Sequence, residues 1–180
     1  MLISYRDCEK RLGNHHQIKK AIEAGKIFKI EAGIYSETPD ISEISLLFFK
    51  YPYAVFTMNS AFYYHGLTDV IPEKYYLATS KDARKIKNDM IRQSFHRENS
   101  FSIGISSMEY RSETIRIYDK ERMLIELIRN KNRLPFDYYK EIIESYRKMV
   151  SQLDLQKLQD YAPAFPKQSR LMETIELEVL

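Results

Sequence analysis

Three carboxylates in the second half of the chain are the first candidates for catalytic chemistry. Asp119 and Glu121 lie two residues apart and Glu126 follows, so together they suggest a metal site of the kind that nucleases use. Their spacing does not repeat as metal ligands usually do, and Asp119 is better placed as the N-cap of a helix. Glu126 is expected on the solvated face of that helix, beside Arg122 and Arg129. We therefore predict no metal site.

His65 is the other candidate for catalysis. It precedes Gly66 at the expected end of a helix, where a positive charge would interact favourably with the helix dipole. No serine, cysteine or carboxylate close by completes a nucleophile arrangement with it. We predict that His65 is structural, that the chain has no catalytic residue and no cofactor, and that the protein is not an enzyme.

Basic and amide side chains near the N-terminus fit a different chemistry, which is contact with DNA. Asn14 is a good N-cap with Gln17 three residues on, and Gly25 is placed as a left-handed C-cap, so residues 14–25 should form a helix. Its apolar residues share one face and its basic residues lie opposite. Gln17 suits a base edge and the lysines suit phosphates. The residues expected to contact DNA are His16, Gln17, Lys19, Lys20, Lys26 and Lys29.

The elements around this helix are those of a winged helix-turn-helix. A helix from Ser4 to Gly13 precedes it, and a tight turn joins the two. Residues 27–30 and 34–36 are β-branched and aromatic with Gly33 between them, which predicts a hairpin. A hairpin directly after a recognition helix is a wing. We predict a DNA-binding domain over residues 1–37, although an ordinary solvated face would also explain the exposed lysines.

The remainder of the chain reads as a second domain, over residues 44–180, after a short polar connection at 38–43. Strand patterns come first and helical patterns later, which predicts a mixed α/β domain with a helical C-terminal part and an α+β class for the whole chain. Strands are expected at 53–56, 75–79, 94–97, 101–105 and 114–118. Helices are expected at 44–51, 57–65, 138–149, 155–162, near 171–175, and from Asp119 onward.

A second group of basic residues lies far from the N-terminal helix. It is opposed only by Asp82 and Asp89, and it would extend a DNA footprint or bind RNA or an acidic partner, while a solvated surface is the alternative. The residues of this possible secondary contact are Lys81, Arg84, Lys85 and Lys87.

The net charge, the length of the apolar runs and the cysteine content limit which partners and which cellular compartment we expect. The net charge of the 180-residue chain is +3, which permits nucleic-acid binding without requiring it. No apolar run is long enough to span a bilayer, so we expect no membrane partner. The single cysteine, Cys8, cannot form an internal disulfide, and we expect a cytoplasmic protein.

Three segments taken together resemble AbiEi-type antitoxins, which belong to bacterial type IV toxin-antitoxin systems that act in abortive infection, a form of phage defence. The first is residues 14–35, especially Gln17–Ile22 and Gly25–Tyr35. The second is Thr57–Thr68, with its His-Gly-Leu end, and the third is Ile115–Leu124. The resemblance covers about residues 1–150 and does not extend to the tail, residues 152–180.

This resemblance implies a transcriptional repressor that binds operator DNA upstream of its own operon. It also implies a cognate toxin of nucleotidyltransferase type, counteracted without necessarily forming a stable complex. A monomer and a homodimer are both compatible with operator binding. Two other functions stay open from the sequence: a nuclease-like enzyme targeted by a winged helix, and a module that binds other proteins.

Overall fold

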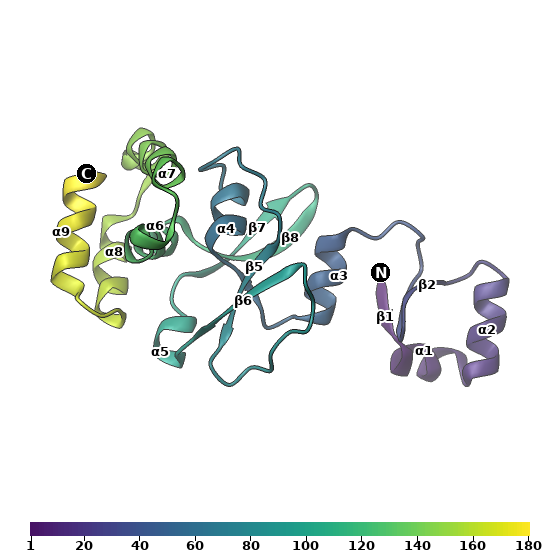
Figure 1. The fold of residues 1–180 in the computed structure, drawn as a ribbon. Coiled ribbons are helices and arrows are strands. Elements are labelled where there is room, and N and C mark those ends of the chain that lie inside the picture. Colours follow the sequence, from purple (N-terminus) through teal and green to yellow (C-terminus); the bar gives the residue numbers. More distant parts are fainter. The chain divides into compact units, whose positions relative to one another are not determined.

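The computed structural model describes residues 1–180 and combines helices with two β-sheets (Figure 1). About 48% of the residues are helical and 20% are in strands, so the chain is α+β, as its sequence predicts. It divides into two compact units, Met1–Pro52 and Tyr53–Leu180. No helix has the length and apolar character needed to cross a membrane.

The first unit is built on a three-stranded antiparallel sheet in the order β1-β3-β2. Two helices lie between the first and second strands along the chain, and a third follows the sheet. The elements are β1 (Leu2–Ser4), α1 (Tyr5–Leu12), α2 (His15–Glu23), β2 (Phe28–Glu31), β3 (Ile34–Ser36) and α3 (Glu43–Lys50).

Local signals explain the expected elements of this unit. The Ser4 hydroxyl accepts a hydrogen bond from the Asp7 backbone N–H, which caps α1. Asn14 Oδ1 accepts from the backbone N–H of Gln17 at 3.1 Å, which caps α2. After α2, Gly25 has a φ of +67°, which few side chains tolerate. The helices near 4–13 and 14–25 and the hairpin are confirmed.

A small apolar core holds the first unit together. Cys8 from α1, Ile18 and Ala21 from α2 and Ile3 from β1 are all buried, together with Ile27 and Tyr35. Burying a large aliphatic side chain contributes about 1.5–3 kcal/mol. The helices α1 and α2 are therefore fixed by the same core as the sheet.

The boundary between the units lies later than the sequence indicated. Residues 38–43 were expected to separate the domains, yet α3 belongs to the first unit. It contacts β1, and Lys50 Nζ lies 2.7 Å from Glu31 Oε2 on β2. These contacts extend the first unit from residue 37 to Pro52.

The second unit has a five-stranded mixed sheet in the order β6-β5-β4-β8-β7. The short strand β4 is central, and its Phe56 pairs with Leu77 on one side and Ile117 on the other. The strands are β4 (Val55–Phe56), β5 (Tyr75–Ser80), β6 (Ile91–His96), β7 (Ile105–Tyr110) and β8 (Glu113–Tyr118). The helices are α4 (Met58–Tyr64), α5 (Glu98–Phe101), α6 (Lys120–Arg129), α7 (Phe136–Lys148), α8 (Leu155–Tyr161) and α9 (Gln168–Glu178).

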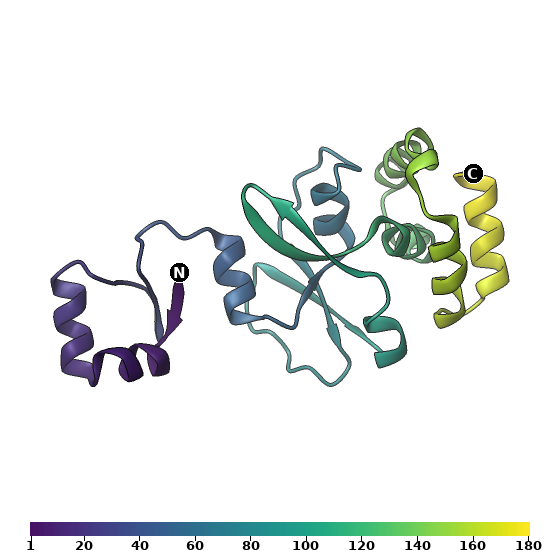
Figure 2. The same ribbon diagram turned by 180° about the vertical axis from the view of Figure 1, so that it is seen from behind.

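Helix α6 lies in the interior of this unit. It contacts α4, α8 and α9, and the C-terminal helices lie beyond it from the sheet, as both views show (Figures 1 and 2). Seven of its ten residues are buried, including Glu121, Arg122 and Glu126. The sequence predicted one apolar face, and the structure instead buries this helix on nearly all sides.

One predicted strand is wrong. Residues 101–105 were expected to be extended, but α5 ends at Phe101 and a turn follows before β7 begins at Ile105. Gly104 makes this turn with a φ of +74°. A short segment with an apolar residue at each end has the sequence pattern of a strand, but here its glycine forms a turn.

Candidate functional site

Helix α2 presents four of the predicted DNA-binding residues to solvent. His16, Gln17, Lys19 and Lys20 are all exposed, while Ile18 between them is 1% exposed and faces the core. This division follows from the helical period, because Ile18 packs inward while its polar neighbours point outward. The structure thus places these side chains together on the outer part of one helix.

The other two predicted residues follow α2 closely. Lys26 is exposed in the turn between α2 and β2, and Lys29 is exposed on β2. Because side chains alternate along a strand, Lys29 points away from half-buried Phe28 and Ile30. The lysines therefore continue from α2 onto the hairpin.

The positive charge of this surface is largely uncompensated. Lys20, Lys26 and Lys29 have no acidic partner in the structure, and Lys19 Nζ lies 4.0 Å from Glu23 Oε1 in a solvent-exposed pair. Three other carboxylates of the unit are paired with cations outside this surface, as Asp7 with Lys10, Glu31 with Lys50, and Glu37 with Arg11. Exposed, unpaired lysines suit phosphate contacts, which need little desolvation to form.

The second basic group lies on the loop between β5 and β6. Ile86 anchors this loop with 8% exposure, and its backbone N–H donates to Gln93 Oε1 at 2.8 Å. Gln93 Nε2 in turn donates to the Arg84 carbonyl at 3.2 Å. The basic side chains of the loop, Lys81, Arg84, Lys85 and Lys87, are exposed.

His65 has a structural contact. Its Nε2 lies 2.7 Å from the Tyr118 carbonyl oxygen and donates to it. Burial lowers the pKa of His65, despite this hydrogen bond to the carbonyl, which acts in the opposite direction. The folded state therefore favours the neutral form of His65. The expected favourable interaction of a positively charged His65 with the helix end is outweighed by burial.

Two of the three candidate carboxylates, Asp119 and Glu121, accept hydrogen bonds from backbone groups. Asp119 Oδ1 accepts from the Arg122 backbone N–H at 2.8 Å and so caps α6, as expected, while Asp119 Oδ2 accepts from the Tyr161 hydroxyl at 2.8 Å. Glu121 Oε1 accepts from the Asp154 backbone N–H at 2.9 Å. No group of three histidine, cysteine, aspartate or glutamate side chains is arranged to hold a metal ion.

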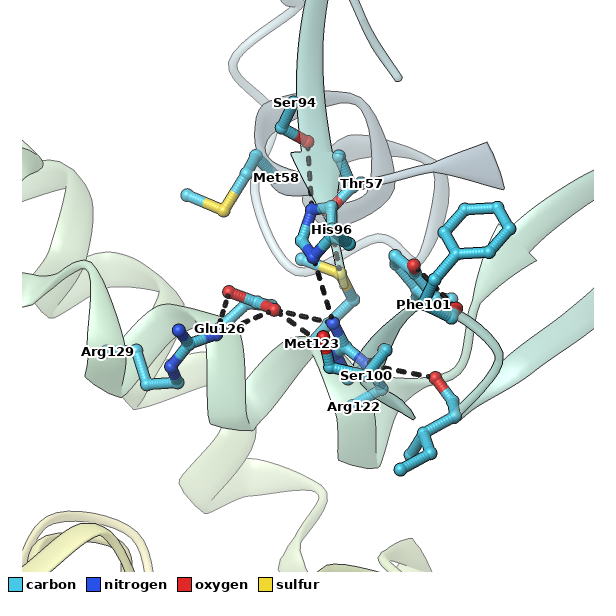
Figure 3. A network of polar contacts seen from close by, with 12 residues as sticks. Thr57, Met58, Ser94, His96, Ser100, Phe101, Arg122, Met123, Glu126 and Arg129 are labelled. Atoms are coloured by element: carbon cyan, nitrogen blue, oxygen red, sulfur yellow. Dashed lines mark hydrogen bonds and ion pairs between the residues drawn. The ribbon is translucent and has the colours of Figure 1, made fainter. Parts of the chain in front are cut away.

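Glu126 is not on a solvated face, which corrects the sequence-based expectation. Glu126 is 3% exposed and Arg122 is fully buried. Glu126 Oε1 lies 2.8 Å from Arg122 Nη2, and Arg129 Nη1 donates to both carboxylate oxygens at 3.1 Å (Figure 3). One carboxylate therefore binds two guanidinium groups, and the small network keeps a surplus positive charge.

Backbone and aromatic groups fix Arg122 in this position. Its Nη1 donates to the carbonyl oxygens of Ser100 and Ile103. The Phe165 ring contacts two guanidinium groups, and its centroid is 4.5 Å from Arg122 Cζ and 4.7 Å from Arg129 Cζ. These contacts satisfy the buried arginine, which would otherwise be costly to remove from water.

His96 completes the network in its neutral form. Its Nδ1 lies 3.4 Å from Arg122 Nη2, which can only donate, so this nitrogen accepts. Its Nε2 lies 3.0 Å from Ser94 Oγ and carries the proton. Burial lowers the pKa of His96, and the neighbouring arginines lower it further, while Glu126 raises it.

A hollow of about 660 Å³ opens beside this network, and we call it the arginine pocket. Buried Glu126 and half-buried His96 belong to its lining, and Arg97, Arg129 and Arg133 lie at exposed positions in it. No motif in the sequence indicates this pocket. The helical spacing of Arg122, Glu126 and Arg129 is visible in the sequence, but the burial of Arg122 and Glu126 depends on α8 and α9, whose packing no local pattern shows.

Comparisons with known proteins leave the chain without an assigned family. No protein-family model matches it, and no curated protein matches its sequence.

Proposed function

We propose that this chain is a DNA-binding antitoxin of the AbiEi type, which represses its own operon and counteracts a nucleotidyltransferase-type toxin encoded beside it. The observation that carries the proposal is the surface formed by α2 and the hairpin after it. Lysines there are exposed, and three of them have no acidic partner. The antitoxin assignment also rests on the three sequence segments that resemble the family.

The order of elements supports a winged helix-turn-helix in the first unit. A strand, two helices and a hairpin follow one another, and the three strands pair in one antiparallel sheet. In this arrangement α2 is the recognition helix and β2–β3 is the wing. His16 and Gln17 near the start of α2 would face base edges, and Lys19, Lys20, Lys26 and Lys29 would contact phosphates.

The second unit would carry the antitoxin function, in the cytoplasm. Its loop with Lys81, Arg84, Lys85 and Lys87 offers a secondary nucleic-acid or partner surface. Every carboxylate that suggested nuclease chemistry is engaged in a cap, a backbone contact or an ion pair. That use supports a regulatory protein over an enzyme, acting as a monomer or a homodimer.

A shift assay on the DNA upstream of the gene tests the DNA-binding part of the proposal. The full chain should retard this DNA at lower concentration than unrelated DNA of the same length. The double variant Lys19→Ala/Lys20→Ala should bind more weakly because two phosphate contacts are lost. Lys140→Gln/Lys148→Gln removes two exposed charges from α7 in the other unit and serves as the matched control.

The outcomes separate the three functions. Equal binding by the wild type and Lys19→Ala/Lys20→Ala would refute the role of α2. Absence of any shift together with co-purification of the neighbouring gene product would favour a protein-binding module. Metal-dependent cleavage that disappears in Asp119→Ala would favour an enzyme. The toxin part is tested by co-expression, in which the chain should restore growth of cells that make the neighbouring protein.

A further inference from the structure

We propose that the arginine pocket of the second unit binds a small phosphorylated ligand of the nucleotide class. The site differs from the DNA-binding surface in residues and in the unit that carries it, and the inference does not depend on the proposed function. Three features of the pocket lead to this ligand: its unbalanced charge, its free hydrogen-bond donors, and an apolar wall beside them.

The charge of the pocket is unbalanced in favour of an anion. Arg97, Arg129 and Arg133 line it, and Glu126 is the sole carboxylate in the lining. Glu126 already binds the buried guanidinium of Arg122 at 2.8 Å. His96 adds no negative charge, and burial, which lowers its pKa, favours its neutral form. An anion in the pocket would therefore meet several positive groups and one carboxylate that is already neutralised.

The donors that an anion needs are available. Arg129 uses its Nη1 for Glu126, while its Nε and Nη2 make no hydrogen bond within the protein. The side chains of Arg97 and Arg133 have no acidic partner, and both are exposed. Guanidinium groups match phosphate oxygens in geometry and form charge-assisted hydrogen bonds with them. Arg129 is also held in place on one side, which lowers the entropy cost of binding.

The part of the lining next to Arg129 is apolar and suits a flat ring. Residues 163–166 contribute Pro163, Ala164, Phe165 and Pro166 to it. Asn99, which is exposed in the same lining, carries an amide that can both donate to and accept from a base edge. A volume of about 660 Å³ lies within the range of small-molecule sites. Phosphate at the arginines and a base at this wall would occupy both parts.

Backbone strain at the pocket agrees with a binding role. Met58, which lies in the lining, has a φ of +42°, in a region that non-glycine residues rarely adopt. Strained residues of this kind concentrate at ligand sites, where the surrounding structure holds them in place.

Calorimetric titration of the full chain tests the proposal with a defined set of probes. These are inorganic phosphate, adenosine, and the monophosphates and diphosphates of adenosine, guanosine, cytidine and uridine. At least one nucleotide should bind, and phosphate and adenosine should each bind at least about tenfold more weakly. In Arg97→Gln/Arg133→Gln, the affinity for that nucleotide should fall about tenfold or more, because two charge-assisted contacts are removed.

Two controls make the result decisive. Arg97 and Arg133 are exposed, so their replacement should leave the melting temperature unchanged, and Lys140→Gln/Lys148→Gln should bind like the wild type. The proposal is overturned if no nucleotide binds at millimolar concentration, or if phosphate alone binds as tightly as any nucleotide. Undiminished affinity in Arg97→Gln/Arg133→Gln, or binding of oligonucleotides alone, would overturn it too.

Discussion

Two ion pairs with the same helical spacing behave in opposite ways in the two units. On α2, Lys19 and Glu23 are about two-thirds exposed and their charged atoms lie 4.0 Å apart. On α6, Arg122 and Glu126 are buried and lie 2.8 Å apart. The sequence interval is four residues in both cases. Spacing alone places the two groups on one helix face. The difference shows that burial by the surrounding structure decides whether such a pair supports folding or stays available for binding.

The exposed positive charges on α2 and the buried one on α6 should therefore have different functions. An exposed pair contributes about 0.3–0.5 kcal/mol to a helix, so Lys19 can exchange its carboxylate partner for a phosphate at little cost. A buried pair is expensive to break, since the remaining charge stays in a medium of low polarity. Substitutions on α2 should therefore change binding, and substitutions around Arg122 should change folding.

The largest effect is expected from Glu126→Ala. This change leaves Arg122 buried without its carboxylate and should lower the free energy of unfolding by about 3–5 kcal/mol. Glu23→Ala breaks the exposed pair of the same spacing and should change the free energy of unfolding by less than about 1 kcal/mol. Urea unfolding followed by circular dichroism measures both. Similar losses in the two variants would contradict the contrast between the pairs.

A smaller loss is expected from Gly104→Ala. A Cβ at this residue would lie 2.5 Å from Arg122 Cβ, and the φ of +74° disfavours a side chain as well. Gly33 in the first unit has a similar φ of +77°, but a Cβ there would meet nothing within 4 Å. Gly104→Ala should lower the free energy of unfolding by more than about 1 kcal/mol, and by more than Gly33→Ala does. The reason is that Gly33→Ala adds backbone strain alone.

Thermal melting of the two glycine variants separates these contributions. If Gly33→Ala lowered the melting temperature as much as Gly104→Ala, close packing against Arg122 would not be the reason for the glycine.

The smallest effect is expected from mild acid acting on the second unit. Burial lowers the pKa of His65 and His96 in the folded state below the ordinary value of 6.5. The unfolded chain then binds more protons than the folded chain as pH falls, so stability falls too. Between pH 7.5 and 6.5 the loss should stay below about 1 kcal/mol for both histidines together.

Hydrogen exchange resolved by segment measures this effect. Protection of the sheet of the second unit should decrease on lowering the pH, and the decrease should be smaller in His96→Asn. A decrease of equal size in wild type and His96→Asn would exclude His96 as one of the groups responsible.

Elements with local signals could be predicted from sequence, and those that depend on distant partners could not. The helix caps at Ser4, Asn14 and Asp119 can be predicted from the residues next to them in the sequence, and the structure confirms them. Strand β1 was missed because its three residues pair with β3, about thirty residues away. A strand this short shows no period in the sequence.

The candidate sites divide in the same way. The exposed residues of α2 could be named from helix periodicity, since burial of Ile18 follows from the pattern itself. The arginine pocket could not, because Glu126 is covered by packing that involves the tail, residues 152–180, where the sequence shows no familiar pattern. Arg129 and Phe165 meet there across a long stretch of chain.

The salt dependence of DNA binding tests the central claim most directly, namely that the lysines of α2 contact phosphates. Fluorescence anisotropy with the upstream DNA gives the association constant at several salt concentrations for the wild type, for Lys19→Ala/Lys20→Ala and for Lys140→Gln/Lys148→Gln. Loss of two phosphate contacts should make the slope of log K against log salt shallower by about 2 in the α2 variant alone. A slope unchanged from the wild type in that variant would contradict the claim.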